Sequence, residues 1–439
     1  MGLASTVSIV VGGVIGSGIF MKPLDIARHS PGPLWIHACW IVLGVICLFG
    51  AFAYAELGVL LPQAGGQYAF LREAWGRFPA FLYGWCLFLV INTGTMAALA
   101  VAFAGSLASI APMSAAAQMA VAAAMILVLA AVNHFGVGAG AALQNVATLA
   151  KLAALAAIVL GGFAASPPAA PAVAATASPD LMGGLVVAAV AIFWTYEGWY
   201  QIAFSAAELA HPERTLPRGL ILGTAILIVT YVAVNAAYLR VVPFAEMRSL
   251  TDEIQVPRLA IERMLGGPAD NLLAALICLS TFGAANPNLL STPRAFYAMA
   301  QDGLLFRPLM AVHHRHRTPT IAIWTQALWA MGLVIVLKRF RDITEFVVFA
   351  ALLFYALTVA AVYVLRHTRR EQVRAYRCWG YPWSPALFIL VVLFVDVRTL
   401  AQPESRHNAL LGLVILAAGA LAYCLVRQKN TDKPASRPY

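Results

Sequence analysis

Long apolar runs, separated by short polar or proline-containing stretches, recur along all 439 residues of the chain. A bilayer core about 30 Å thick needs about 20 apolar residues per helix, and runs of that length occur repeatedly here. The pattern therefore predicts an all-α polytopic membrane protein with 12 transmembrane spans. The predicted spans are residues 4–27, 34–61, 80–110, 115–133, 141–164, 181–209, 218–241, 270–300, 319–337, 343–365, 384–401 and 408–427.

The composition agrees with this pattern, because 61% of the residues are hydrophobic and only 11% are charged. Soluble domains carry about 25% charged residues, so a soluble fold is excluded. The six cysteines are scattered without paired spacing, which supports neither a disulfide framework nor a zinc site. We expect no metal, no cofactor and no catalytic residues, since no constellation of nucleophile, base or metal ligands is assembled within the spans.

The net charge of +10 is distributed over the loops, a pattern that orients a membrane protein rather than one that binds nucleic acid. Loops after even-numbered spans and the tail at 428–439 hold more Lys and Arg than the loops on the other side. This bias predicts that both termini are cytoplasmic, in a multi-pass protein of an inner membrane. The basic run His313–Arg317 resembles a metal or phosphate cluster, but a solvated loop is the simpler interpretation.

Two spans contain residues that interrupt a helix. Three closely spaced glycines occupy residues 12–16 and a fourth follows at Gly18, and each costs about 1 kcal/mol in a helix relative to alanine. They predict either an unwound stretch or close packing against a neighbouring helix. A second interruption, with Glu197 and Gly198, falls in the sixth span.

Interrupted helices at matching positions of two halves are typical of inverted-repeat transporters with a binding site near the bilayer midplane. The proline-rich stretch at 166–180 then becomes an external linker between the halves. We expect the following segments: 1–165 as the first repeat (spans 1–5), 181–366 as the inverted second repeat (spans 6–10), and 383–427 as spans 11 and 12.

Two ionisable residues lie within predicted spans. Lys151 is deep in the fifth span, where an ammonium costs about 2.5–3.5 kcal/mol, so it is expected to pair with carbonyls or a carboxylate. It is either a fixed structural cation that holds the first break or a group that gives up its proton during a transport cycle. Glu197 either contacts a substrate ammonium or is a water-exposed acid at a cavity wall.

The sequence is similar to the amino acid–polyamine–organocation superfamily, and within it to the L-type amino acid transporters and their bacterial relatives. The resemblance covers most of the chain, and its motifs are strong only together. They lie at residues 11–20, 54–76, 144–151 and 196–218.

The resemblance implies a LeuT-type fold of 5+5 inverted repeats with two extra helices, and a substrate bound between the first and sixth spans. The backbone at Gly16–Gly18 would bind the carboxylate, and Trp194 would be an aromatic gate. The carbonyls of Val14 and Ile15 and those near Trp194 would bind the ammonium. The full expected site is Val14, Ile15, Gly16, Ser17, Gly18, Trp194, Thr195, Tyr196, Glu197 and Gly198.

Lys151 matches the lysine that replaces sodium in sodium-independent relatives. The resemblance thus implies a sodium-independent transporter of amino acids, preferably neutral ones, that works by alternating access as an exchanger. A proton-coupled permease for cationic amino acids or polyamines is the alternative. Glu197 stands where the mammalian branch has glycine, and Tyr200 is bulkier than usual, so the side chain of the substrate stays open.

Mammalian members of the resembled branch pair with a single-span glycoprotein through a cysteine between the third and fourth spans. Residues 105–117 of this chain contain no cysteine, so we expect no disulfide-linked heavy chain. The remaining expected partners are an amino acid substrate and the lipid bilayer.

Overall fold

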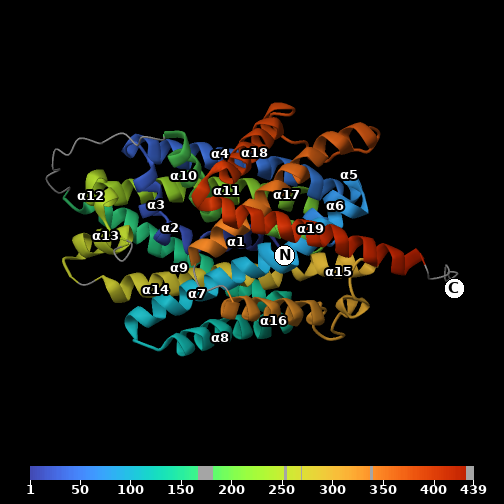
Figure 1. Ribbon diagram of the computed structural model, residues 1–439, viewed down its shortest axis with the longest axis horizontal. Coiled ribbons are helices and arrows are strands. Elements are labelled where there is room, and N and C mark those ends of the chain that lie inside the picture. Colours follow the sequence, from blue (N-terminus) through green and yellow to red (C-terminus); the bar gives the residue numbers. More distant parts are fainter. Residues whose placement is uncertain (167–180, 252–254, 268, 337–339, 432–439) are drawn as a thin grey trace.

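The computed structural model describes residues 1–166, 181–251, 255–267, 269–336 and 340–431, and its described secondary structure is helical. Most helices run along the long axis of the molecule (Figure 1). Within the described ranges, 10 helical segments are long and apolar enough to cross a membrane, and two shorter apolar helices lie at Thr320–Val336 and Ala409–Leu425. The prediction of a multi-pass helical membrane protein is confirmed, whereas the count of 12 spans stays a prediction.

The chain forms its helices in a simple order. The first part contains α1 (Leu3–Val14), α2 (Gly18–Met21), α3 (Pro23–His29), α4 (Pro33–Leu60), α5 (Gln67–Trp75), α6 (Arg77–Cys86), the π-helix η1 (Leu87–Ile91), α7 (Asn92–Ile110), α8 (Ala115–His134) and α9 (Val137–Ala164). The second part contains α10 (Leu181–Tyr196), the 3₁₀-helix η2 (Gln201–Glu208), α11 (Pro212–Val241), α12 (Phe244–Ser249), α13 (Val256–Leu265), α14 (Asp270–Leu290), α15 (Pro293–Gln301), η3 (Arg307–Met310), α16 (Thr320–Val336), α17 (Phe340–Thr368), α18 (Trp383–Ala401) and α19 (Pro403–Thr431).

Two predicted spans are divided differently from the prediction. The first span, predicted at 4–27, ends with α2 at Met21, and Pro23 starts the separate helix α3. The eighth span, predicted at 270–300, is found at Asp270–Gln301, but it contains a turn, because α14 ends at Leu290 and Pro293 starts α15. Proline is suited to the first turn of a helix, where its missing N–H would have no partner, so it marks both new starts.

Helix packing places the two interrupted spans inside the bundle. Helix α1 packs against α9, α11 and α14, and α10 packs against α3, α4, α17 and α18. The scaffold around them consists of helix pairs, α4 with α11, α7 with α14 and α8 with α16. Both interrupted spans therefore have their polar backbone surrounded by protein, as backbone at membrane depth requires.

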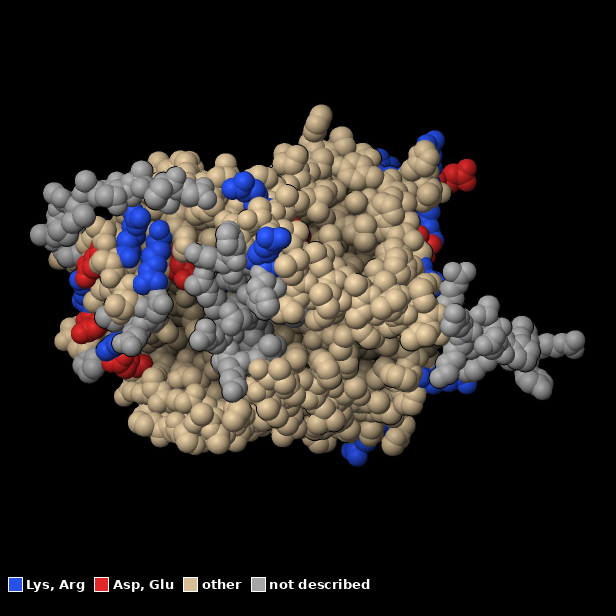
Figure 2. Space-filling view, viewed as in Figure 1, with Lys and Arg blue, Asp and Glu red and all other residues tan. Residues whose placement is uncertain are grey.

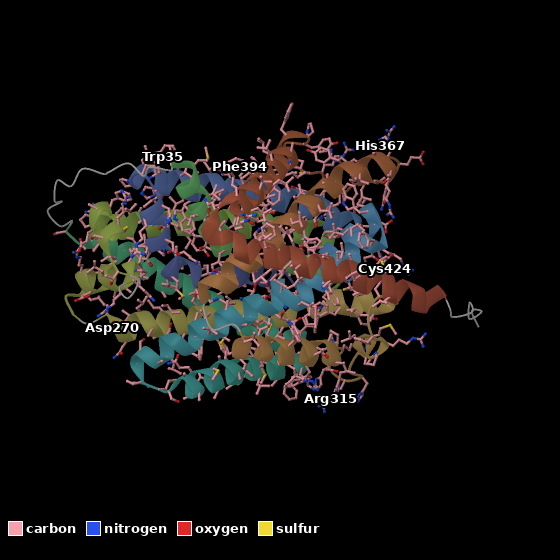
Figure 3. All side chains as sticks on the ribbon, in the orientation of Figure 1. Trp35, Asp270, Arg315, His367, Phe394 and Cys424 are labelled. Carbon is pink, nitrogen blue, oxygen red and sulfur yellow. The ribbon has the colours of Figure 1, made fainter. Side chains whose placement is uncertain are left out.

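The charged side chains gather toward the two ends of the long axis and leave a largely uncharged middle (Figure 2). Asp270 lies at one end, and Arg315 and His367 lie toward the opposite end (Figure 3). This distribution fits a bilayer that covers the middle of the molecule. Residues 167–180 of the predicted linker and 432–439 of the predicted tail lie outside the described residues, and α19 extends to Thr431, beyond the predicted end of the last span at 427.

Candidate functional site

The first span is interrupted after Val14, where α1 ends. Ile15 has an extended backbone, with φ −68° and ψ 92°, and the helix resumes only at Gly18. At Gly18 a Cβ atom would lie 2.8 Å from the Cα atom of Thr195, so only glycine lets α2 approach α10 this closely. Both interpretations of the glycines therefore hold: they accompany an unwound stretch and also allow close packing.

Lys151, from α9, holds this break together. Its ammonium donates hydrogen bonds to the carbonyl oxygens of Gly12, at 2.8 Å, and Ile15, at 2.7 Å. The side chain is buried, and Gly283 on α14 leaves room for it, because a Cβ there would lie 2.8 Å from the Lys151 Cε. The Ser280 hydroxyl lies 2.9 Å from the Gly16 carbonyl oxygen and 3.1 Å from that of Ile15. Protein donors thus satisfy the carbonyls that the break frees.

The sixth span is interrupted between Tyr196, where α10 ends, and Gln201, where η2 begins. Gly198 has φ +106°, a conformation that other residues rarely adopt. A Cβ on Gly198 would lie 3.3 Å from the carbonyl oxygen of Gly13, so this turn lies directly against α1. The two predicted interruptions are therefore neighbours in space.

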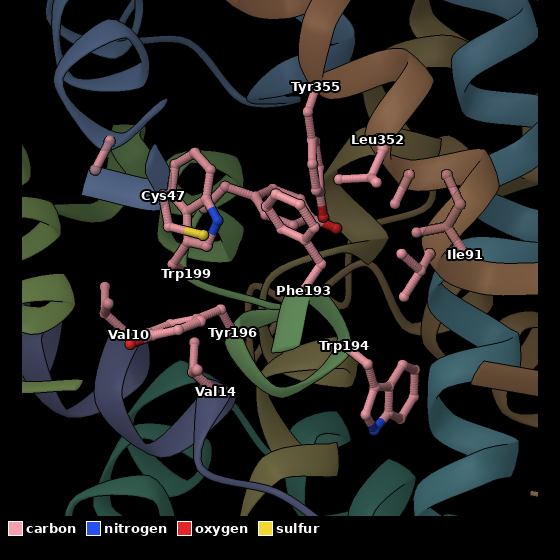
Figure 4. Packing of buried hydrophobic residues seen from close by; sticks show 14 of the residues in the cluster. Val10, Val14, Cys47, Ile91, Phe193, Trp194, Tyr196, Trp199, Leu352 and Tyr355 are labelled. Atoms are coloured by element: carbon pink, nitrogen blue, oxygen red, sulfur yellow. The ribbon is translucent and has the colours of Figure 1, made fainter. Parts of the chain in front are cut away.

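Glu197 in this turn is held by tyrosines. Its Oε1 atom accepts hydrogen bonds from the hydroxyls of Tyr355 on α17, at 2.5 Å, and Tyr200, at 3.2 Å. The aromatic side chains surround the break, with Tyr196 and Trp199 on one side of Phe193 and Trp194 on the other (Figure 4). The Tyr200 hydroxyl thus binds the carboxylate three residues earlier in the chain.

Tyr231, on α11, links the two breaks. Its hydroxyl lies 3.2 Å from the carbonyl oxygen of Val14 and 3.0 Å from that of Thr195. These are carbonyls at the ends of α1 and α10, where helical hydrogen bonding stops. The sequence predicted no role for Tyr231, and its only signal is a phenol in an apolar span.

A small cavity of about 20 Å³, which is room for about one water molecule, lies between the two breaks. Six of the ten predicted site residues line it, together with Gly13 of α1 and four residues from α7, η2 and α14. The lining consists of Gly13, Val14, Gly16, Ser17, Gly18, Thr95, Leu99, Trp194, Glu197, Gln201 and Ala284.

The other four predicted residues, Ile15, Thr195, Tyr196 and Gly198, do not line the cavity. The Ile15 carbonyl accepts a hydrogen bond from Lys151, and the Ser280 hydroxyl, whose one hydrogen also has the Gly16 carbonyl within reach, lies 3.1 Å away. The Thr195 hydroxyl donates to its own helix, and the Tyr196 hydroxyl donates to the Trp40 carbonyl, 3.2 Å away. These residues are adjacent in the chain to residues that line the cavity.

The sequence missed Thr95, Leu99, Gln201 and Ala284. Gln201 gave the clearest signal, since it is an amide directly after the predicted interruption at 193–200. The sequence gives no signal for Leu99 and Ala284. An apolar residue in a span can face a cavity, a neighbouring helix or lipid, and one sequence does not show how the helix is rotated.

Two ion pairs join helices near the sixth span. Arg294 Nε lies 2.5 Å from Glu208 Oε1 and joins α15 to η2, the half of the sixth span after its break. Arg72 on α5 lies 2.6 Å from Asp302, which follows α15 and also accepts a hydrogen bond from Tyr68 at 2.5 Å. The second pair thus joins α5 to the end of α15.

The basic loop His313–Arg317 is held by its own backbone. The N–H groups of Arg315 and His316 both donate to His313 Nδ1, at 3.2 Å. Among the described residues, no group of three or more His, Cys, Asp or Glu is arranged to hold a metal ion. The His313 side chain thus stabilises a turn within this loop.

Comparisons with known proteins agree with this architecture. A model of the amino acid permease family matches residues 1–418. The chain is similar to the serine/threonine exchanger SteT of Bacillus subtilis, with 30% identity over 98% of each chain. It is also similar to the human b(0,+)-type amino acid transporter 1, at 31% over 97% of this chain and 87% of that protein, and to the human cystine/glutamate transporter, at 28% over 95% and 83%. These relatives are exchangers and transporters rather than enzymes, and the chain belongs to the amino acid permease family of the amino acid–polyamine–organocation superfamily.

Proposed function

We propose that the chain is a sodium-independent exchanger of neutral amino acids that binds its substrate between the two interrupted spans. The cavity between the breaks carries this proposal. Among the described residues, the backbone N–H groups of Gly16, Ser17 and Gly18 have no backbone partner, and these residues line the cavity. Free N–H groups of this kind bind a carboxylate, which every amino acid has.

Lys151 supports independence from sodium. In sodium-coupled transporters, unwound backbone carbonyls coordinate the ion. Here the Lys151 ammonium binds the carbonyls of Gly12 and Ile15, with the Ser280 hydroxyl beside them. A positive charge that belongs to the protein already occupies this junction of α1, α9 and α14, so a sodium ion would meet both repulsion and filled ligands.

The arrangement of helices supports alternating access within a 5+5 inverted repeat. Spans two, three and four pack against seven, eight and nine, as a repeat predicts for equivalent helices. The interrupted spans would rock against this scaffold. Movement of η2 away from α15 requires the Arg294–Glu208 pair to separate.

The relatives named above support exchange and a bacterial inner membrane, since one is a bacterial serine/threonine exchanger. We retain the prediction that both termini are cytoplasmic. A disulfide-linked heavy chain is not part of the proposal, because residues 105–117 contain no cysteine.

Glu197 keeps a second candidate open, a proton-coupled permease for cationic amino acids or polyamines. Its carboxylate lines the cavity, where it could attract a positive side chain. The hydroxyls of Tyr355 and Tyr200 already bind its Oε1 atom, however, which favours a supporting role. Inhibition of serine uptake by arginine that disappears in Glu197→Gln would favour this second candidate.

Uptake into proteoliposomes tests the main proposal. Vesicles with or without internal serine are given labelled serine, in sodium or choline buffer and with or without a proton gradient. We expect uptake that depends on internal serine and is equal in both buffers. A requirement for sodium would contradict sodium independence, and gradient-driven uptake into empty vesicles would contradict exchange. An absence of uptake for every amino acid would contradict the substrate class.

A further inference from the structure

Two buried polar atoms of the cavity wall have no hydrogen-bond partner among the described residues. They are Gln201 Oε1 and Ser17 Oγ, on side chains that are 3% and 1% exposed. Both residues line the cavity between the two breaks. Buried polar atoms are normally paired, so each of these atoms indicates a group that a ligand supplies.

The hydrogen-bond network fixes which end of the Gln201 amide faces the ligand. Asn288, on α14, donates its own amide N–H to the Ala284 carbonyl at 3.1 Å, so its Oδ1 must be the acceptor. Gln201 Nε2 donates to that Oδ1 at 3.0 Å. Gln201 therefore has its nitrogen committed to the scaffold and leaves its carbonyl oxygen, which only accepts, for the cavity.

Thr95 adds a second acceptor from α7. Its hydroxyl donates its single hydrogen to the Ile91 carbonyl at 2.6 Å, so only its lone pairs remain for the cavity. One turn earlier on the same helix, Asn92 reaches the backbone carbonyl of Asn288, at 3.5 Å. Thr95 and Gln201 thus both line the cavity with a side-chain acceptor.

The rest of this region is apolar and confined. A Cβ on Gly16 would lie 3.2 Å from Leu99 Cδ2 and 3.3 Å from Ala284 Cβ, so these side chains reach the broken backbone closely. Such a wall accepts a short side chain and leaves little space for a long or aromatic one. Two acceptors within this wall favour a short side chain that donates a hydrogen bond.

We propose that Gln201 and Thr95 form a subsite that selects amino acids with a short hydroxyl-bearing side chain, serine and threonine. This inference rests on the proposed function, since it assigns the substrate class of the same cavity. The substrate hydroxyl donates to one of the two acceptors, while the backbone at the first break binds the carboxylate. Alanine and valine are close in shape to serine and threonine but leave both acceptors buried and unpaired, which is the more costly outcome.

Threonine against valine, and serine against alanine, are the decisive pairs because their members differ little in shape. Uptake into proteoliposomes loaded with serine is measured for each amino acid, as initial rate over concentration. The wild-type protein should prefer the hydroxyl member about tenfold, as expected for one buried hydrogen bond. Gln201→Met and Thr95→Val should each reduce this ratio several-fold.

Ser205→Ala is the matched control, because Ser205 lies on η2 one turn beyond Gln201 and donates to Ser291 rather than lining the cavity. Its threonine-to-valine ratio should equal that of the wild-type protein. If Gln201→Met weakens every amino acid equally, Gln201 binds the shared ammonium and the subsite is refuted. An unchanged ratio in both variants refutes it as well.

The wild-type protein decides the matter even if the variants fail to fold. Equal uptake of threonine and valine by the wild-type protein overturns the subsite while leaving amino acid exchange intact. An absence of uptake for every amino acid overturns the proposed function instead, so the two failures are distinguishable. A preference for threonine that Gln201→Met or Thr95→Val removes would establish the subsite.

Discussion

The break in the first span and the break in the sixth span are stabilised in different ways. At the first break, Lys151 and Ser280 bind the freed carbonyls, and the backbone itself lines the cavity. At the second break, side chains dominate, with Glu197 held by two tyrosines and Gln201 directed by Asn288. The first break is thus a backbone site fixed by the scaffold, and the second is a side-chain site.

This difference suggests a division of labour. Backbone N–H groups are the same in every protein, and they suit the carboxylate that all amino acids share. Side chains change with a single substitution, and they suit the part of the substrate that varies. Damage to the first break should therefore weaken all substrates together, whereas changes at the second break should alter the choice among them.

The largest effect is expected from removing the ammonium that holds the first break. Lys151→Met leaves the carbonyls of Gly12 and Ile15 without their donor, at about 1–3 kcal/mol for each buried group. Uptake of every amino acid should fall by about 100-fold. Uptake in proteoliposomes, with size-exclusion chromatography to confirm folding, measures this, and a folded variant that keeps near-normal uptake would show that Lys151 is dispensable.

A smaller loss should follow when Lys151 is displaced rather than removed. Gly283→Ala places a Cβ 2.8 Å from both Ala147 Cβ and Lys151 Cε and 2.9 Å from Lys151 Nζ, so α9 and its lysine must shift away from the break. We expect a loss of about tenfold, which corresponds to about 1.4 kcal/mol.

Gly332→Ala is the matched control for this substitution. It adds the same methyl group to α16, where no atom lies within 4 Å of the new Cβ. Equal uptake by the two glycine variants would argue against a strict position for the ammonium.

Tyr231→Phe removes the hydroxyl that joins the two breaks. One neutral hydrogen bond contributes about 0.5–1.5 kcal/mol, so uptake should fall by about fivefold for all substrates. Tyr238→Phe is the control, because the Tyr238 hydroxyl on the same helix is buried and has no hydrogen-bond partner among the described residues. A greater loss in the Tyr238 variant would contradict the bridge between the breaks.

The smallest effect on overall rate should come from Tyr355→Phe. Glu197 keeps its bond to Tyr200 but loses the shorter one, so its carboxylate becomes more available to the cavity. Serine uptake should change by about twofold, while inhibition by arginine strengthens. A variant in which arginine inhibits no better than before would mean that Tyr355 does not shield Glu197.

The fold could be predicted where a residue destabilises an apolar membrane helix and so marks an interruption. The glycines of the first span and Glu197 in the sixth are expensive in an apolar helix, and both marked real interruptions. The break before Pro293 was missed, because the apolar residues that begin the run at 270 were given more weight than the polar residues and prolines at 286–294.

The candidate site was predictable only where its residues belong to an interruption. Lys151 could be identified from the sequence because burying a charged side chain in a span is costly. The structure places its ammonium on the carbonyls of the first break. Tyr231 and Thr95 could not be identified from the sequence. Their part in the site depends on the rotation of an intact helix and on neighbours that are far away in the chain.

The most direct test of the central claim compares one side chain at each break. Ser17→Ala and Gln201→Met each remove one buried polar atom from the same cavity. Uptake of serine, alanine, threonine and valine is measured for both variants and for the wild-type protein. We predict that Ser17→Ala lowers all four by the same factor and that Gln201→Met lowers serine and threonine alone. Selectivity that changes in Ser17→Ala and stays constant in Gln201→Met would contradict the division between the two breaks.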